Sequence, residues 1–244
     1  MALLSLEHVT RRFGGIVAVN DVSLDAEAGQ IVGLIGPNGA GKTTLFNLIT
    51  RLYKPDSGDI VFDGASLLHT PAHEIVRHGI ARTFQNVVLF RSMSVLENVL
   101  VGLQSRTGPG VDRTERRALE LLDYVGLAAS ANQPAAGFPL PTMKRIEVAR
   151  ALAAGPKLLL LDEPASGLNH EEVEHLADFL RGLPADFSLT VLLVEHHMNL
   201  VMRISETVHV LDFGELIASG TPDEVRVNRA VIDAYLGVDD DAAA

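Results

Sequence analysis

The feature that most constrains this chain is a glycine-rich segment, Gly36–Thr43, within the run GLIGPNGAGKTTL. A glycine, four further residues and then Gly-Lys-Thr form the phosphate-loop pattern. An apolar run at 31–35 precedes the segment, and a helix-forming run at 43–49 follows it. The pattern in this strand-to-helix context predicts a loop that binds the phosphates of a nucleoside triphosphate.

Elementary chemistry gives each part of the predicted loop a task. The glycines let successive backbone N–H groups face phosphate oxygens, and the helix that follows adds the positive end of its dipole. We expect Lys42 to reach the β- and γ-phosphates, and the Thr43 hydroxyl to take one coordination position of Mg²⁺. The loop residues predicted to contact the nucleotide are Gly36, Asn38, Gly39, Ala40, Gly41, Lys42, Thr43 and Thr44.

A second informative stretch carries two adjacent acids. The saturated apolar run 158–161 predicts a central parallel strand, and Asp162 and Glu163 follow at its carboxyl end, where α/β sheets place their ligands. A magnesium-bound nucleotide explains two acids at this position better than a solvated strand end does. We therefore predict that Asp162 holds Mg²⁺ and that Glu163 orients or deprotonates the attacking water.

Composition narrows the class of protein. Hydrophobic residues make up 47% of the 244 residues and aromatics 5%, which indicates the aliphatic core of an α/β protein with a parallel sheet. The absence of cysteine excludes disulfides, thiolate metal sites and cysteine nucleophiles. A net charge of −11 argues against general binding to nucleic acid or to an anionic membrane. No membrane-spanning run or signal pattern occurs, so we expect a cytoplasmic chain.

The pattern of elements indicates three regions. Short strands at 3–9, 16–19 and 22–24, with a hairpin-like turn at Ala28-Gly29, predict a β-rich amino end. A run of helices at about 94–154, opened by a capping box at Ser94 and Glu97, interrupts the strand–helix alternation and predicts an inserted helical subdomain. The last residues, 238–244, are acidic and alanine-rich and are predicted to be a disordered tail.

Three single residues allow two interpretations each. Phe13 is either a partly buried loop aromatic, which its position alone favours, or a platform for a nucleotide base. Gln85, after a short predicted strand, is either a hydrogen-bonding residue at the edge of the core or a ligand of Mg²⁺ or water. His196, after the apolar run 189–194, either caps a strand or contacts the γ-phosphate.

The order of these motifs resembles the nucleotide-binding subunits of ATP-binding-cassette (ABC) transporters over nearly the whole chain. The resemblance implies a P-loop NTPase fold of the ABC ATPase type across 1–237, with a RecA-like core, an amino-terminal antiparallel β subdomain and the inserted helical subdomain. It also implies that Phe13 stacks on adenine and that Gln85 links Mg²⁺ and the attacking water to the membrane partner. Glu163 then corresponds to the catalytic base and His196 to the γ-phosphate switch.

Further stretches narrow the resemblance within this family. The segments at 11–20, 82–86 and 220–237 look like the ATPase subunits of importers for branched-chain (hydrophobic) amino acids, and urea importers share much of the pattern. This implies hydrolysis of ATP with Mg²⁺, a second ATPase subunit, two transmembrane permease subunits, indirect dependence on a solute-binding protein, and a position at the cytoplasmic face of the membrane. A soluble regulatory ATPase that is not coupled to transport is the alternative.

One segment departs from the family pattern. The signature Leu-Ser-Gly-Gly-Gln falls at 138–142, where this chain has Phe-Pro-Leu-Pro-Thr. In the family this segment clasps the γ-phosphate that is held by the opposite subunit, and proline supplies neither an N–H nor a hydroxyl. Pro139 and Pro141 therefore predict a heterodimer with one strong and one weak site, and a homodimer is the alternative. Thr142 is a candidate helix cap or hydroxyl donor.

Overall fold

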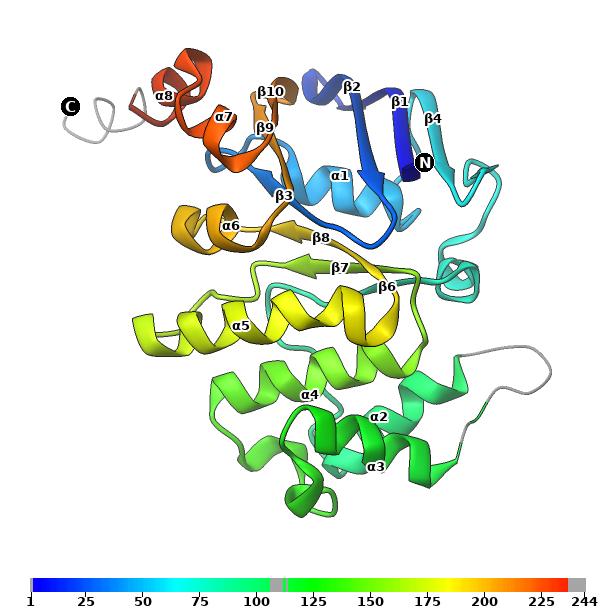
Figure 1. The fold of residues 1–244 in the computed structure, drawn as a ribbon. Helices are drawn as coiled ribbons and strands as arrows, with labels where there is room; N and C mark the ends of the chain where they lie inside the picture. Colours follow the sequence, from blue (N-terminus) through cyan, green and yellow to red (C-terminus); the bar gives the residue numbers. More distant parts are fainter. Residues whose placement is uncertain (1, 106–111, 113, 237–244) are drawn as a thin grey trace.

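The described part of the chain forms two β-sheets and a layer of helices (Figure 1). The computed structural model describes residues 2–105, 112 and 114–236. The smaller sheet has the strand order β2-β1-β4-β5, and its paired strands are antiparallel. Its strands are β1 (Ala2–Phe13), β2 (Ile16–Glu27), β4 (Ser57–Phe62) and β5 (Ala65–Ser66).

The larger sheet carries the ligand-binding edge. Its order is β10-β9-β3-β8-β7-β6, parallel throughout except for the β9–β10 hairpin. Every residue of β3, β7 and β8 is buried, because both faces of these strands are covered. The carboxyl ends of the three strands therefore lie side by side and present the residues that follow each. The strands are β3 (Ile31–Ile35), β6 (Ile80–Arg82), β7 (Leu158–Asp162), β8 (Thr190–Val194), β9 (Thr207–Asp212) and β10 (Glu215–Gly220).

Alternate side chains of the larger sheet enter two different cores. Ile31 and Ile35 of β3 pack in the cluster that also holds the helices after β7 and β8, whereas Val32 and Leu34 pack with the smaller sheet. Helix α1 (Lys42–Ile49) belongs to the second cluster, where Phe46 is fully buried. Helices α5 (His170–Phe187) and α6 (Met198–Ile204) belong to the first.

The amino end differs from the predicted short strands. Residues 16–27 form one strand, β2, in which Val22 and Leu24 face the core and Ser23 between them is exposed. The predicted hairpin at Ala28-Gly29 is wrong, because β2 pairs with β1 while β3 pairs with β8 and β9. The chain changes sheet at this turn, since the apolar β3 requires burial on both faces.

The helical layer falls within the predicted stretch 94–154. It contains α2 (Val95–Gln104), α3 (Glu115–Tyr124) and α4 (Leu140–Ala153), with the short 3₁₀ turns η2 (Ala128–Ser130) and η3 (Ala135–Gly137). The capping box at the start of α2 is confirmed: Glu97 N donates to Ser94 Oγ at 3.1 Å, and Ser94 N donates to Glu97 Oε2 at 2.7 Å. Helices α2 and α4 approach closely at Gly102, which has no side chain. A Cβ there would lie 2.1 Å from the Arg150 carbonyl oxygen.

The remaining segments flank these layers. The 3₁₀ helix η1 (Ala72–His78) precedes β6, and helices α7 (Pro222–Arg226) and α8 (Arg229–Leu236) follow β10. The predicted tail at 238–244 lies outside the described residues. Within the part of the chain that the structure describes, no helix combines the length and apolar character needed to cross a bilayer.

Candidate functional site

The glycine-rich segment is a tight turn between β3 and α1. Gly36, Gly39 and Gly41 have φ angles of 152°, 83° and 101°, a region that other residues rarely adopt. A Cβ at Gly36 would lie 2.1 Å from the Leu211 carbonyl oxygen, and one at Gly41 would lie 2.4 Å from that of Ala18. Two of the three glycines are thus required by space as well as by conformation.

Lys42 reaches back over this loop. Its Nζ donates to the carbonyl oxygens of Gly36 at 2.7 Å and Pro37 at 2.8 Å. Burial lowers the pKa of Lys42, and the negative charges of Glu163 and Asp162 oppose that shift. The ammonium group therefore lies where the loop turns, and the two carboxylates at the carboxyl end of β7 act on it electrostatically.

An open cavity of about 280 Å³ lies at the start of α1. Lys42, Thr43 and Thr44 line its polar side, and Phe213, which is 86% exposed, lines its apolar side. Sequence reasoning missed Phe213, although an aromatic residue directly before a glycine, between two apolar runs, was a usable signal. The other lining residues are Ile16, Val17, Ala18, Gly39 and Gly41.

Phe13 lies outside the lining of this cavity. Its ring meets that of Tyr53 edge-on, with centroids 5.1 Å apart, and the Arg11 guanidinium lies 4.6 Å from its centroid. The ring is 37% exposed. One part of it is therefore packed in the amino-terminal loop while another remains accessible, so stacking on adenine stays a prediction.

Glu163 is the point at which the distant motifs meet. Gln85 Nε2 donates to Glu163 Oε2 at 2.7 Å, and His196 Nδ1 lies 3.7 Å from the same oxygen. Glu163 itself has a φ of 47°, and its N–H donates to the Val194 carbonyl at 2.9 Å. The turn after β7 is thus fixed to the end of β8, which brings the carboxylate between the glutamine and the histidine.

Asp162 ends β7 and is nearly enclosed. Its side chain is 5% exposed, and its Oδ2 accepts a hydrogen bond from Arg82 Nη2 at 2.7 Å. Sequence reasoning gave no role to Arg82, although a charged residue at the end of the short apolar strand β6 was a signal for one.

The chemistry of the predicted metal ligands fits magnesium. A threonine hydroxyl at the start of α1, a carboxylate at the end of β7 and the amide oxygen of Gln85 are all hard oxygen donors, which Mg²⁺ prefers. Gln85 uses its amide nitrogen toward Glu163, which leaves the oxygen as the coordinating atom. Thr43, Asp162 and Gln85 thus form a donor set appropriate for this ion.

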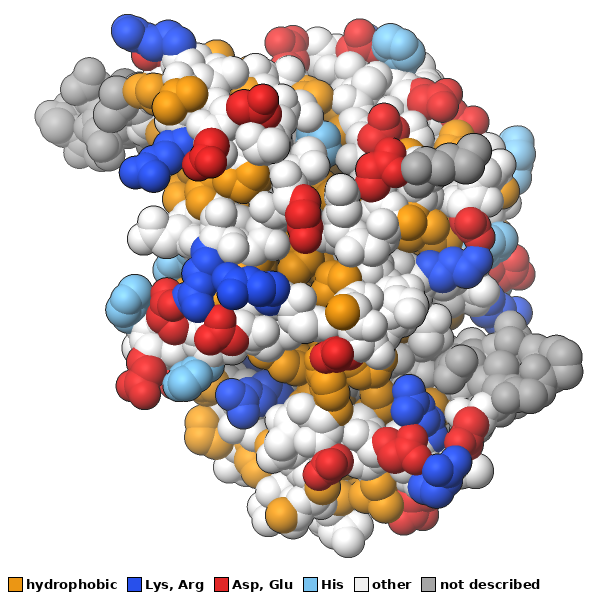
Figure 2. Space-filling view, viewed as in Figure 1, with side chains coloured by type: hydrophobic (Ala, Val, Ile, Leu, Met, Phe, Trp, Pro, Cys, Tyr) orange, Lys and Arg blue, Asp and Glu red, His pale blue; other side chains and the backbone are white. Residues whose placement is uncertain are grey.

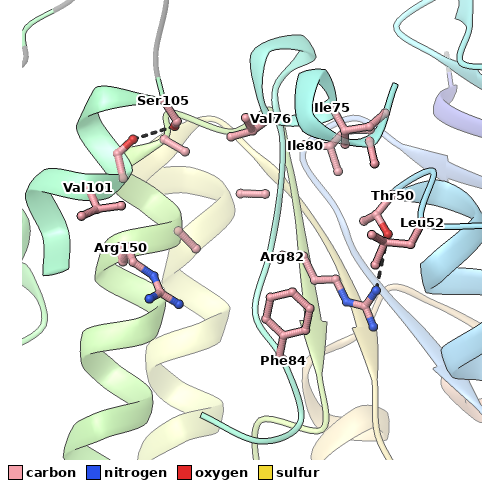
Figure 3. A pocket seen from close by; sticks show the side chains of 15 residues that line it. Thr50, Leu52, Ile75, Val76, Ile80, Arg82, Phe84, Val101, Ser105 and Arg150 are labelled. Carbon is pink, nitrogen blue, oxygen red and sulfur yellow. Dashed lines mark hydrogen bonds between the residues drawn. The ribbon is translucent and has the colours of Figure 1, made fainter. Parts of the chain in front are cut away.

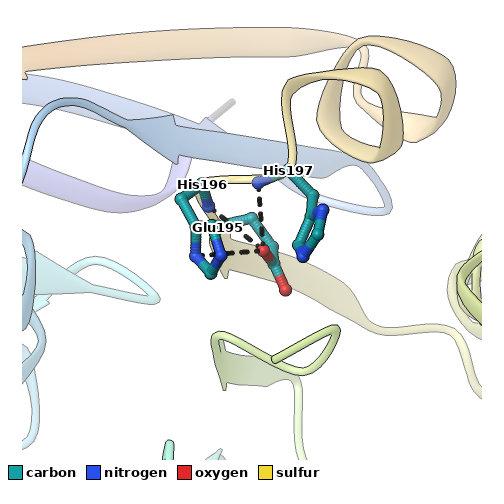
Figure 4. A group of neighbouring side chains, drawn as sticks. All are labelled: Glu195, His196 and His197. Carbon is teal, nitrogen blue, oxygen red and sulfur yellow. Dashed lines mark hydrogen bonds and ion pairs between the residues drawn. The ribbon is translucent and has the colours of Figure 1, made fainter. Parts of the chain in front are cut away.

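A buried glutamate supports the histidine segment after β8 (Figure 4). Glu195 is fully buried; its Oε1 accepts the N–H of Ala165 at 2.6 Å, and its Oε2 accepts those of His196 at 3.1 Å and His197 at 3.3 Å. The ligand atoms of Glu195, His196 and His197 lie within 4.8 Å of one another, a spacing compatible with a metal ion. Because backbone donors already occupy both carboxylate oxygens, Glu195 fixes the backbone on each side of the site.

The signature segment is built differently from the prediction. Helix α4 begins at Leu140 with Pro139 as its N-cap, and no side chain caps it. The predicted capping role of Thr142 is therefore wrong, because Thr142 lies inside the helix. Pro139 at the N-cap and Pro141 in the first turn are both compatible with a helix start. The fixed φ angle of proline suits these positions.

Lys144 on the same helix is a link that sequence reasoning missed. Its Nζ donates to the carbonyl oxygens of Pro164 and Ser166, each at 2.7 Å, and to that of Glu163 at 3.3 Å. Burial lowers the pKa of Lys144, opposed by the charges of Glu195, Glu147 and Glu163. The start of α4 is thereby tied to the turn that carries the Glu163 carboxylate.

A largely apolar groove opens between the helical layer and the larger sheet (Figure 3). It has a volume of about 340 Å³. Its walls come from the end of α1, η1, β6, α2 and α4, and Arg82 and Arg150 are its two arginines. The labelled residues around it are Thr50, Leu52, Ile75, Val76, Ile80, Arg82, Phe84, Val101, Ser105 and Arg150.

Comparison with known proteins agrees with this architecture. The family model described as ABC transporter matches residues 19–166, and the one described as branched-chain amino acid ATP-binding cassette transporter matches residues 215–241. The high-affinity branched-chain amino acid transport ATP-binding protein BraF of Pseudomonas aeruginosa is 43% identical over 96% of this chain and 98% of its own length.

Solved structures give the same result. The ADP conformation of MJ1267, an ATP-binding cassette of an ABC transporter, superposes with a TM-score of 0.86 at 29% identity, covering 97% of this chain and 99% of that one. A dimeric post-hydrolysis state of the cassette MJ0796, bound to ADP and Pi, superposes with a TM-score of 0.78 at 29% identity, covering 90% and 98%.

The fold and the assembled site define an ATP-binding-cassette ATPase, and the chain belongs to the ABC transporter family. Within that family it is an ATP-binding subunit of the branched-chain amino acid transporter type. The predicted fold, with an antiparallel amino-terminal sheet beside a mostly parallel core sheet, is confirmed.

Proposed function

We propose that this chain hydrolyses ATP to power a membrane importer of branched-chain or other hydrophobic amino acids. The observation that carries the proposal is the convergence on Glu163: Gln85 donates to its carboxylate, and His196 lies 3.7 Å from the same oxygen. A general base, a residue able to report on the γ-phosphate and a phosphate loop are the parts that hydrolysis of ATP needs.

Each residue then has a defined task in hydrolysis. The loop N–H groups and Lys42 bind the β- and γ-phosphates, and Glu163 accepts a proton from the attacking water. His196 donates to a γ-phosphate oxygen, while Gln85 holds the water in line. Backbone bonds from Ala165 and His196 to Glu195 keep the base and the histidine at fixed separation. Preorganised donors of this kind stabilise the charge that develops on the transferred phosphoryl group.

Magnesium is the expected metal in this site. Thr43, Asp162 and Gln85 would hold it, and it would supply charge neutralisation of the β- and γ-phosphates. Asp162 provides the only full negative charge among these three ligands, so its orientation governs how well the site takes the ion.

The site is completed by a second ATP-binding subunit. The dimer of MJ0796 in a state bound to ADP and Pi supports this arrangement by similarity of fold. In this chain the donated segment has Pro139 and Pro141, which lack N–H donors, so the site that uses it is weakened. The other site, with this chain's loop and a partner's intact signature, is the strong one. The assembly is accordingly a heterodimer.

The permease subunits dock in the groove of Figure 3. Its largely apolar walls suit a short amphipathic helix from a membrane partner. Phe84 lines the groove, is 42% exposed and precedes Gln85, so a docked helix lies next to the catalytic segment. Docking of this kind places the chain at the cytoplasmic face of the membrane.

The decisive experiment compares ATP hydrolysis by the chain alone with that of its mixture with a second ABC ATPase subunit that carries an intact signature segment. We expect the mixture to be faster by about tenfold or more, since removing one set of transition-state donors costs at least this factor. Equal rates would contradict the asymmetric dimer. Uptake of leucine by the reconstituted transporter, measured beside uptake of urea, tests the solute.

A further inference from the structure

The strongest unassigned feature of the molecule is a buried arginine that touches the predicted metal carboxylate. The Arg82 side chain is 7% exposed and that of Asp162 is 5% exposed. Burying a charge is costly unless it is paired and hydrogen-bonded, so this arginine is held in place by specific contacts.

Those contacts fix the guanidinium from several directions. Nη2 donates to Asp162 Oδ2 at 2.7 Å, and Nη1 donates to Asn47 Oδ1 at 2.7 Å and to Thr50 Oγ1 at 3.4 Å. Asn47 and Thr50 belong to the helix that begins at the phosphate loop and to its C-cap. The planar, forked guanidinium suits this task because it bonds several acceptors in one plane, which an ammonium group does not.

Two aromatic rings complete the enclosure. The Arg82 guanidinium carbon lies 5.4 Å from the ring centroid of Phe46 and 5.1 Å from that of Phe84. Both distances fall within the range of cation–π attraction. Figure 3 shows Arg82 beside Phe84 on the wall of the groove. The arginine therefore connects the phosphate-loop helix, the glutamine segment and Asp162 in one rigid cluster.

We propose that Arg82 is a positioning residue for magnesium, which orients the Asp162 carboxylate by holding Oδ2 and leaves Oδ1 to face the ion. The inference rests on the proposed function and deepens it, because it names the residue that sets the metal affinity of the site. Removing a residue that hydrogen-bonds to a metal-ligating side chain commonly lowers metal affinity by 10- to 100-fold.

The test measures binding of the metal separately from binding of the nucleotide. The full chain is titrated with AMP-PNP in EDTA, and then with Mg²⁺ at saturating AMP-PNP, with the thermal midpoint as readout. For Arg82→Met we expect unchanged nucleotide affinity in EDTA and a rise of about tenfold or more in the Mg²⁺ concentration at half effect. Arg82→Lys keeps the positive charge but lacks the forked guanidinium. We expect its Mg²⁺ requirement to lie between that of the wild-type chain and that of Arg82→Met.

Arg51→Met is the matched control. Arg51 is a second buried arginine and lies just beyond α1, but its bond goes to the Leu68 carbonyl at 2.5 Å and not to Asp162. We expect the Mg²⁺ requirement of this variant to equal that of the wild-type chain. A requirement raised as much as in Arg82→Met would attribute the effect to general loss of a buried arginine and overturn the proposal.

A further variant guards against loss of folding in Arg82→Met. Asn47→Ala removes the nearer of the two Nη1 acceptors and keeps the pair with Asp162, so we expect a smaller rise in the Mg²⁺ requirement in the same direction. An unchanged requirement in both variants, or an equal loss of AMP-PNP affinity with and without metal, overturns the proposal. Failure of the wild-type chain to bind AMP-PNP at all would instead overturn the proposed function, and the proposal with it.

Discussion

Gln85 Nε2 donates a hydrogen bond to Glu163 Oε2 at 2.7 Å, across 78 positions of sequence. The glutamine comes from the segment after β6 and the glutamate from the turn after β7, two strands that are neighbours in the parallel sheet. The bond joins a residue next to the groove of Figure 3 to the proposed base. Under the proposed function, a change at the groove would reach the reacting water through this one side chain.

Glu163→Gln is expected to lower the rate of ATP turnover sharply and to keep the binding of ATP. The amide still accepts the hydrogen bond from Gln85, so the site keeps its shape, but it does not take a proton from water. Loss of a general base lowers the rate by about 10²- to 10⁴-fold. Phosphate release and equilibrium binding of ATP measure the two properties; a variant that turns over at the wild-type rate excludes Glu163 as the base.

The two glycines Gly36 and Gly39 are expected to differ in their tolerance of alanine. Gly36→Ala places a Cβ 2.1 Å from the Leu211 carbonyl oxygen, whereas a Cβ at Gly39 has no atom within 4 Å. We expect Gly36→Ala to lower the free energy of unfolding by about 3 kcal/mol. Gly39→Ala has only the strain of its positive φ, about 1 kcal/mol. Urea unfolding without nucleotide measures both, and equal losses would contradict the clash.

Single tryptophan variants report where the base lies, because the chain has no tryptophan of its own. In Phe13→Trp we expect ATP to change the emission and tripolyphosphate to leave it unchanged, since only ATP carries a base to stack. Phe213→Trp provides the comparison from a position that lines the cavity at the start of α1. If only Phe213→Trp responded to ATP, the adenine base would lie near Phe213 and not near Phe13.

His209 is expected to make the fold sensitive to acid. The ring is 4% exposed, and its Nε2 contacts the Asp25 carbonyl oxygen at 2.9 Å. Burial lowers the pKa of His209 below its ordinary 6.5, although the bond to the Asp25 carbonyl and the Asp25 charge oppose the shift. Below pH 6.5 the unfolded chain thus binds a proton that the folded chain does not, so stability falls as the pH falls toward the lowered pKa.

The measurement is the urea midpoint at pH 7.5 and at pH 5.5. His209→Gln keeps a donor toward Asp25 and removes the titration, so its midpoint changes less between the two pH values than that of the wild-type chain. The exposed His69→Gln is the control and is expected to behave as wild type. A His209→Gln variant with the full wild-type pH dependence would assign the acid sensitivity to other groups.

Local patterns in the sequence were sufficient for the fold class and for the loop. The run at 31–35 is buried on both faces, and the Gly-Lys-Thr pattern after it lies at a helix start, because both depend on neighbours in sequence. The capping box at Ser94 and Glu97 belongs to the same category. The prediction of a hairpin at Ala28-Gly29 was wrong, because turn residues do not determine which sheet the next strand joins.

What only the tertiary structure decided are the contacts between distant segments. Arg82 meets Asp162, Lys144 meets the carbonyls of Pro164 and Ser166, and Glu195 meets the N–H of Ala165. None of these pairs has a spacing that a periodic pattern encodes, because each depends on which strands lie side by side. The sequence by itself determined that a phosphate loop and a pair of carboxylates exist. Parallel strand order determined which charges hold them in place.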